Sequence, residues 1–358
     1  MAGLKKVLRH IRIYGLLRVL AKISSRKSIA VTFRKLSLFK SYKTDLNVKF
    51  IGLGHHAYSS LACHIAMYTN SKFFKSFDIN KERIDLFSRA FDFSARNYDI
   101  CYIASNHSTH ARYAIDEINK GNSVYVEKPL AVNLEELVSI KDAIQTNPTV
   151  KLWLGYNRPF SKAMERISKV IREETDSSFT YSAFVRGHFI GEDHWYRNDK
   201  EGSRIISNVG HWIDLFVYLL FLVGERSPDL EISITKASQM QSGENISLSI
   251  STGKGHLANL TFVSRNEPLN GVEEKIEIQS PNYNFSIDDF RTMTETTSTK
   301  IKRYSYFPKD NGHKLSALQP FHDMVERSCD ELFFSTELML FIEGMAKSNI
   351  SIKRFSRT

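Results

Sequence analysis

The chain has 358 residues, of which 42% are hydrophobic and 25% charged; this is ordinary for a globular protein and enough for two domains. Its net charge of +10 is confined to residues 1–47, where twelve lysines and arginines accompany one acid, so residues 48–358 carry a net −1. A neutral body argues against a broad nucleic-acid-binding surface, and we expect no nucleic-acid partner.

The three cysteines, Cys63, Cys101 and Cys329, are widely spaced along the chain. Their spacing argues against a disulfide framework and against a metal site, and it fits the reducing cytoplasm. No apolar run reaches the roughly 18 residues that span a bilayer, and the longest, 213–223, is predicted to be a buried helix. We expect a cytoplasmic protein with no metal.

Residues 1–46 are a basic leader, predicted as two amphipathic helices that are broken at Gly15. The apolar faces of the two helices comprise Leu4, Val7, Leu8 and Ile11, then Leu16, Leu17, Leu20 and Ile23. Such a hairpin either docks on its own protein or a second subunit, or lies on an anionic membrane surface through residues 1–40. The second alternative would place the protein at the inner face of the membrane.

Strands and helices alternate over residues 47–155, which predicts a doubly wound parallel sheet, a dinucleotide-binding Rossmann domain. The predicted strands are 48–51, 73–77, 99–105, 124–127 and 150–154, and the predicted helices run to about 69 and over 81–90, 109–120 and 134–145. Asn133 and Glu136 have the spacing of a capping box for the last helix.

Residues 156–358 are predicted as a second domain, of α+β type, in which the chain becomes rich in β-forming residues beyond residue 178. The predicted strands are 178–186, 230–237, 246–252, 256–263 and 275–279, and the predicted helices are 211–222, 316–328 and 335–347. Glycine, proline and asparagine turns separate the strands, which favours a mainly antiparallel open sheet with helices on one face. The fold class is therefore α/β plus α+β.

A glycine-rich turn, Gly52-Leu53-Gly54-His55-His56-Ala57, joins the first strand to its helix. Glycines there let the backbone approach a pyrophosphate, and a helix start offers free N–H groups. Asp78 ends the second strand, where an acid accepts hydrogen bonds from a ribose 2′-hydroxyl and repels a 2′-phosphate. The sequence therefore predicts NAD rather than NADP; a plain turn with a surface aspartate is the alternative.

Glu127-Lys128-Pro129 follows a strand of the parallel sheet, at the edge where such sheets bind ligands. Lys128 could hydrogen-bond, or exchange a proton with, the oxygen of a group being oxidised. His211 and Asp214 lie three apart at a predicted helix start, and the imidazole could take the alcohol proton. Capping or packing is the alternative for His211.

These motifs together resemble the glucose–fructose oxidoreductase/inositol dehydrogenase/MocA (Gfo/Idh/MocA) family over roughly residues 47–358. The resemblance rests on Phe50-Ile-Gly-Leu-Gly, Phe77-Asp-Ile-Asn, Tyr102-Ile-Ala-Ser-Asn-His-Ser-Thr-His-Ala, Val126-Glu-Lys-Pro-Leu-Ala-Val, Gly155-Tyr-Asn-Arg-Pro-Phe-Ser, Trp195-Tyr-Arg and Gly210-His-Trp-Ile-Asp-Leu. The branch it most resembles includes the C-terminal half of two-part oxidoreductases encoded with bacterial surface-polysaccharide genes. Members share a basic leader and a stretch like Gly312-His-Lys.

The resemblance implies an NAD(P)-dependent enzyme that oxidises or reduces a hydroxyl or keto group of a sugar, cyclitol or nucleotide sugar in cell-surface polysaccharide synthesis. It implies that Lys128 and His211 are catalytic, and that the C-terminal sheet forms a homo-oligomer. The implied cofactor contacts are Gly52, Gly54, His55, His56, Asp78, Ser105, Asn106, His107, His110, Glu127 and Lys128. The implied substrate contacts are Asn157, Arg158, Trp195, Arg197, Asn208 and Asp214.

The sequence departs from the family pattern at two places. Ser207 stands where many members have an aspartate four residues before the histidine. Only eight residues, 91–98, separate the helix 81–90 from the next strand, so the outer edge strand of a full Rossmann sheet is predicted to be missing. These departures favour an alternative function, a non-catalytic descendant that acts as a nucleotide-binding or scaffolding subunit.

Overall fold

A computed structural model describes residues 2–27, 41–174, 177–191, 193–237, 245–264 and 271–357. The chain divides into two compact domains, and we describe each by itself. The first comprises Met1–Phe160 and Gly312–Cys329; the second comprises Ser161–Asn311 and Asp330–Thr358. Part of the predicted leader, residues 28–40, lies outside the described residues.

The leader begins as the two predicted helices, α1 (Ala2–Tyr14) and α2 (Leu16–Lys27), joined at Gly15 in the left-handed conformation (φ 78°). A small apolar cluster that includes Tyr14 and Val19 holds the two helices together. Helix α2 also packs on the first domain, because Ala21 is 1% exposed within that domain's core and the Ser24 Oγ lies 2.7 Å from the Tyr58 hydroxyl.

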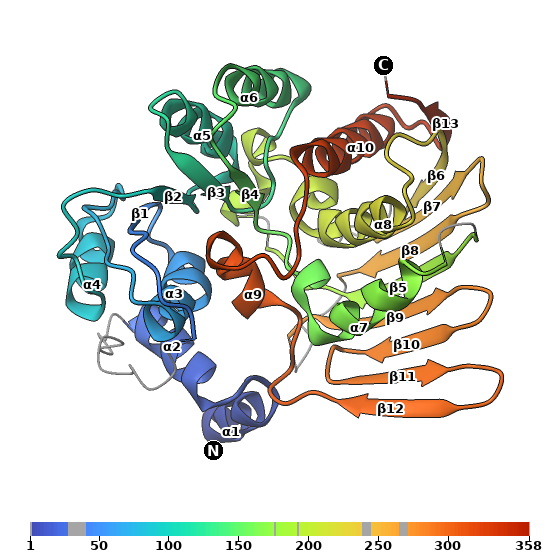
Figure 1. Cartoon of the computed structure of the whole chain (residues 1–358), viewed down its shortest axis with the longest axis horizontal. Coiled ribbons are helices and arrows are strands. Elements are labelled where there is room, and N and C mark those ends of the chain that lie inside the picture. Colours follow the sequence, from blue (N-terminus) through green and yellow to red (C-terminus); the bar gives the residue numbers. More distant parts are fainter. Residues whose placement is uncertain are drawn as a thin grey trace. The chain divides into compact units, whose positions relative to one another are not determined.

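The first domain is built on a parallel sheet, as predicted, but the sheet has four regular strands and not the predicted five (Figure 1). Its strands, in the order β1-β2-β3-β4, are β1 (Val48–Ile51), β2 (Ile100–Ile103), β3 (Ser123–Val126) and β4 (Leu152–Leu154). The helices between them are a π-helical turn (Ala57–Ala62) continued by α3 (Cys63–Tyr68), then α4 (Lys81–Ala90), α5 (His110–Ile118) and α6 (Leu134–Thr146). The predicted capping box is present in a shifted form: Asn133 accepts from Glu136 N–H at 2.8 Å, and Glu136 accepts from the N–H of Val132, the residue before the N-cap, at 2.9 Å.

The outer edge of this sheet is short, as the sequence predicts. The predicted strand 73–77 pairs with β1 only through isolated parallel bridges at Phe73 and Phe77. In the described residues no strand lies between α4 and β2, so 73–77 has no outer neighbour to complete a ladder. Phe91 instead follows α4 into the core, where its ring lies 5.0 Å from that of Phe73 and 5.2 Å from that of Phe87.

The second domain is a nine-stranded sheet with helices on one face, again as predicted (Figure 1). Its strand order is β12-β11-β10-β9-β5-β8-β7-β6-β13, and all pairings are antiparallel except β5 with β8. The strands are β5 (Thr180–Arg186), β6 (Leu230–Lys236), β7 (Ile246–Thr252), β8 (Leu257–Val263), β9 (Glu273–Gln279), β10 (Asn284–Asp288), β11 (Thr292–Thr296), β12 (Ile301–Ser305) and β13 (Ile352–Phe355). The helices are α7 (Lys162–Ile171), α8 (Gly210–Leu222) and α10 (Cys329–Lys347).

The predicted buried helix is α8, which lies in the most apolar part of the chain. The stretch Asp199–Leu222 is long and apolar enough to cross a membrane by length and composition. Within the protein, however, 78% of its most apolar part is buried, which is typical of a core helix.

The predicted helix 316–328 is wrong in its bounds. The chain forms α9 (His313–Ala317) and then a 3₁₀ turn, Gln319–Phe321. Pro320 lies inside that turn and lacks the N–H that a continuing α-helix needs, so the helix ends before it. This segment belongs to the first domain.

Candidate functional site

The glycine turn after β1 requires Gly52. This residue has φ +87°, and a Cβ there would lie 2.5 Å from the backbone of Ala104 and Ser105 at the end of β2. A Cβ on Gly54 would meet no atom within 4 Å, so the space beside it is open. The turn therefore packs tightly on β2 at its first glycine and leaves room for a ligand at its second.

Asp78 holds the same turn from the neighbouring segment. Its Oδ2 accepts a hydrogen bond from Leu53 N–H at 2.6 Å, and its Oδ1 accepts from Asn80 N–H at 2.8 Å. Each carboxylate oxygen has two lone-pair sites, so both can accept further hydrogen bonds. The predicted ribose-binding acid thus lies against the predicted phosphate-binding turn.

The two histidines of the turn are exposed and contact different neighbours. The His55 ring lies 3.0 Å from the Arg83 guanidinium, and burial together with that cation lowers the pKa of His55. The His56 Nε2 lies 3.1 Å from Oε1 of Glu127. His56 therefore links the glycine turn to the end of β3.

The residues after β2 connect two loops at the same edge. The Ser105 hydroxyl lies 2.7 Å from that of Thr109, and the buried His110 ring has nitrogens 3.1 Å from the Ser105 carbonyl and 2.8 Å from the Pro129 carbonyl. Burial lowers the pKa of His110. His107 is buried beside His110, whereas Asn106, the residue before His107, is exposed.

The segment after β3 presents Lys128 and buries both its neighbours. Burial of Glu127 raises the pKa of its carboxyl, but the charges of His56 and Lys128 outweigh burial and hold that pKa below its usual range. The Lys128–Pro129 peptide bond is cis. Over residues 124–131 Lys128 alone keeps partial exposure, so it is the side chain there that a ligand can reach.

Side chains from far along the chain complete this edge, and sequence reasoning missed them. The Tyr102 hydroxyl donates to the Ala317 carbonyl at 2.8 Å, and Gln319 donates to the Leu154 carbonyl at 3.1 Å. The His313 ring lies 5.8 Å from that of His56. The signal in the sequence is the Gly312-His-Lys stretch shared with the resembling family branch; Gly312 adopts the left-handed conformation (φ 86°) just before α9.

The remaining predicted residues of the first domain lie just after β4. Asn157 and Arg158 are both buried, and the Arg158 guanidinium donates to the Asn157 Oδ1 at 2.8 Å. The pair follows Gly155, where a Cβ would lie 2.9 Å from the Glu127 carboxyl group. The structure therefore brings the predicted cofactor residues, Asn157 and Arg158 to the carboxyl ends of the parallel strands.

The second domain holds His211 at the start of α8. Over residues 204–220 only Asn208 and His211 keep partial exposure, and they are three residues apart, on the same side of the helix. The neighbouring Trp212 is buried and donates from Nε1 to the Glu274 carboxylate at 2.9 Å. Helix α8 therefore leaves the His211 imidazole accessible, while the neighbouring Trp212 fixes the helix to the sheet.

The other predicted residues of the second domain differ in exposure. Asp214 is fully buried and accepts a hydrogen bond from the Ser335 hydroxyl of α10 at 2.9 Å. Ser207 is buried with its hydroxyl 3.3 Å from the Asn208 side chain. Trp195 is 42% exposed, and Arg197 donates to the Ile190 carbonyl at 3.0 Å.

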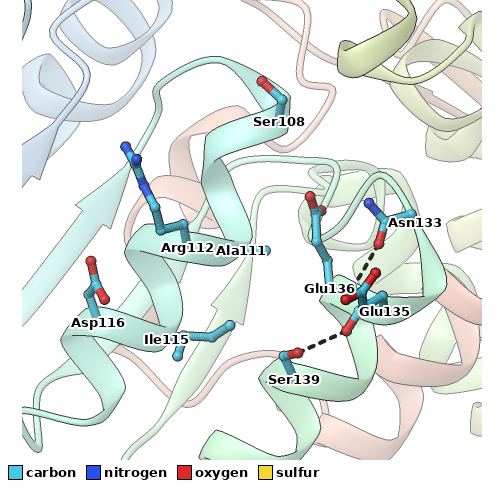
Figure 2. Close-up of a pocket in the computed structure, with 9 residues that line it drawn as sticks. All are labelled: Ser108, Ala111, Arg112, Ile115, Asp116, Asn133, Glu135, Glu136 and Ser139. Carbon is cyan, nitrogen blue, oxygen red and sulfur yellow. Dashed lines mark hydrogen bonds between the residues drawn. The ribbon is translucent and has the colours of Figure 1, made fainter.

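A separate open pocket of about 390 Å³ lies between α5 and α6 (Figure 2). Arg112 and Asp116 line it from α5, and Glu135 and Glu136 line it from α6. None of the predicted cofactor or substrate residues lines this pocket. We therefore assign the candidate site to the strand ends.

Most of the first domain is similar in sequence to the Gfo/Idh/MocA oxidoreductase family. Residues 46–156 match the profile of that oxidoreductase family, which describes an NAD-binding Rossmann fold. Comparison with curated protein sequences gives no match.

Solved structures share the fold of nearly the whole chain. A Gfo/Idh/MocA family oxidoreductase from Vibrio cholerae is 14% identical, with a TM-score of 0.67 over 86% of this chain and 99% of that one. A dehydrogenase from Clostridium difficile is 17% identical, with a TM-score of 0.65 over 84% and 99%. GenD2 from gentamicin A biosynthesis, in complex with NAD, is 14% identical, with a TM-score of 0.65 over 87% and 96%. At these identities the likeness establishes the fold.

Proposed function

We propose that this protein is an NAD-dependent oxidoreductase acting on a hydroxyl or keto group of a sugar, cyclitol or nucleotide sugar. The observation that carries the proposal is the convergence of Gly54, Asp78 and Lys128 at the carboxyl edge of a family-type Rossmann sheet. The resemblance to the surface-polysaccharide branch supports a role in cell-surface glycan synthesis.

The residues of the glycine turn fit a dinucleotide. The open space at Gly54 admits a pyrophosphate close to the backbone, and the helix start behind it offers N–H groups. The Asp78 carboxylate retains lone pairs for ribose hydroxyls and would repel a 2′-phosphate, which favours NAD over NADP. GenD2, which shares the fold, is in complex with NAD.

NAD, when bound, would supply the hydride acceptor at its nicotinamide ring. Lys128 would hydrogen-bond the substrate oxygen, since its ammonium group has three donors. His211 would take the hydroxyl proton as general base. With Ser207 in place of an acid, proton transfer would rest on these two residues, and we assign Asp214 to holding α8 against α10.

Two further properties are part of the proposal. Exposed apolar side chains on the second domain's sheet, Phe184 (46%) and Leu257 (42%), support a homo-oligomer formed through that sheet. The cysteines, which are all free thiols, support a cytoplasmic location.

A second candidate is a nucleotide-binding or scaffolding subunit without turnover. The short outer edge of the sheet favours it, because β1 is flanked there by two isolated bridges instead of a regular strand. That edge lies beside Asp78, so a weak ribose site is the expected consequence.

A direct absorbance assay of NAD reduction separates the two candidates. We expect the purified protein to reduce NAD with a member of a nucleotide-sugar panel, followed by the absorbance of reduced nicotinamide. Lys128→Met should lose about 10²–10⁴-fold in turnover while it still binds NAD, because it removes a positioned proton donor. The matched control is Lys120→Met, which removes a surface lysine of the same domain that pairs with Glu117 and should leave turnover unchanged.

Three outcomes would count against the proposal. Wild-type turnover in Lys128→Met would remove this lysine from the mechanism. NADP binding as tight as NAD binding would show that Asp78 does not face the ribose. A wild-type protein that binds NAD but turns over no member of the panel would favour the scaffolding subunit.

A further inference from the structure

The outer side of the leader hairpin carries an apolar stripe. Leu16, Leu20 and Ile23 are 53%, 38% and 39% exposed and are spaced four and three residues apart, so they share one face of α2. On α1, Leu8 is 53% exposed. We call Leu16, Leu20 and Ile23 of α2 the leader stripe.

Contacts on the inner side of α2 fix the direction of the leader stripe. Ala21 is buried in the first domain's core, and Ser24 is buried with its hydroxyl 2.7 Å from that of Tyr58. Arg83 donates to the Ser25 carbonyl at 2.9 Å. Because these contacts hold one face of α2 on the domain, the opposite face is presented outward without any rearrangement.

Cations border the leader stripe. Lys5 and Arg12 on α1 and Arg26 and Lys27 on α2 are exposed. Residues 1–27 hold eight lysines and arginines and no acid, whereas residues 48–358 carry a net −1. The positive charge of the leader therefore has no counterpart in the rest of the chain.

We propose that the α1–α2 hairpin binds the surface of an anionic lipid bilayer, with the leader stripe inserted among the lipids and the bordering cations at the headgroups. An apolar helix face flanked by lysine and arginine is the arrangement that interfacial helices use. A second copy of the chain fits less well, because pairing two leaders would bring like charges together. This inference does not depend on the proposed enzymatic activity.

Vesicle binding by the full-length protein tests the proposal. We expect co-sedimentation with vesicles that contain phosphatidylglycerol but not with pure phosphatidylcholine, and weaker binding at 1 M salt, where the Debye length falls to about 3 Å. The triple substitution Leu16→Gln, Leu20→Gln, Ile23→Gln should weaken binding to anionic vesicles by at least about tenfold, because it removes the inserted apolar area.

The control variant is Leu134→Gln, which replaces a 61%-exposed leucine on α6 of the same domain and should bind vesicles as the wild type does. Thermal unfolding of each variant verifies that the fold is intact. Equal binding by the triple variant and the wild type, or binding that does not distinguish anionic from neutral vesicles, would overturn the proposal. So would absence of vesicle binding, or a change in oligomer mass as the sole effect of the triple substitution.

Discussion

Gly52 and Gly54 contribute differently to the site although one residue separates them. At Gly52 the left-handed conformation and the 2.5 Å approach to the β2 backbone make a side chain incompatible with the fold. At Gly54 the surrounding space is open, so a side chain would compete with a ligand and not with the protein. Substituting each glycine therefore separates folding from binding.

We expect Gly52→Ala to lower the free energy of unfolding by about 2–5 kcal/mol. An alanine there is strained in the left-handed conformation, and its Cβ also overlaps the backbone after β2. Gly54→Ala should change that free energy by no more than about 0.5 kcal/mol. It should still weaken NAD binding, because its methyl group would stand where the pyrophosphate approaches. Chemical denaturation and NAD titration of both variants measure the two effects. Unchanged NAD affinity in a folded Gly54→Ala would place the pyrophosphate elsewhere.

The sequence predicted the local part of this site and not its long-range part. The spacing of Gly52, Asp78 and Lys128 indicated strand ends, and a parallel sheet brings such ends to one edge. The contacts of His313 with His56 and of Gln319 with the end of β4 join segments more than 160 residues apart. Nothing in the local pattern of either segment encodes that pairing, so it had to come from the structure.

At the scale of elements, three helices of the first domain meet around His64 of α3. Burial, with the nearby cations Arg18 of α2 and Lys314 of α9, lowers the pKa of His64 from 6.5 to about 3. The Lys314 ammonium also lies 4.0 Å from the centre of the Tyr68 ring. The junction therefore keeps the imidazole neutral at pH values where it would be protonated in the unfolded chain.

This depressed pKa makes stability depend on pH. Below pH 6.5 the unfolded chain binds a proton at His64 that the folded protein does not, so the free energy of unfolding falls as the pH drops from about 6.5 toward 3. At pH 5 the loss from this residue should be about 2 kcal/mol. In His64→Leu that part of the loss should disappear. Denaturation of both proteins at pH 7 and pH 5 gives the comparison.

The comparison at pH 7, where His64 is mostly neutral in both states, isolates the packing effect of the leucine. If stability falls equally between pH 7 and pH 5 in both proteins, His64 titrates normally in the folded state and the junction is less closed than the contacts indicate.

Elements with strong local signals were predictable, and those defined by neighbours were not. Helix 81–90 was predicted at the bounds that α4 has, and its N-cap Asn80 accepts from Glu82 N–H. Strands β10, β11, β12 and β13 were missed, and β12 and β13 are exposed along most of their length, so they lack the alternation that identifies a strand. The segment 73–77 has a strand-like sequence but lacks the outer partner that would complete it.

At the scale of the whole molecule, the basic leader is part of the first domain and not a detachable tail. Residue Ala21 of α2 lies in the core, and Ser24 satisfies the hydroxyl of the fully buried Tyr58. Residues 1–27 also hold most of the net charge, since removing them lowers it from +10 to +2. Stability and surface charge are thus combined in one segment.

We therefore expect deletion of residues 1–27 to lower the thermal midpoint and cause aggregation, because it exposes the apolar surface that α2 covers and leaves the Tyr58 hydroxyl without Ser24. Ser24→Ala alone should cost only about 1–3 kcal/mol and leave the protein monodisperse. Thermal unfolding with light scattering, for the full chain and both variants, measures this. A truncated protein that stays monodisperse with an unchanged midpoint would show that the leader adds charge without supporting the core.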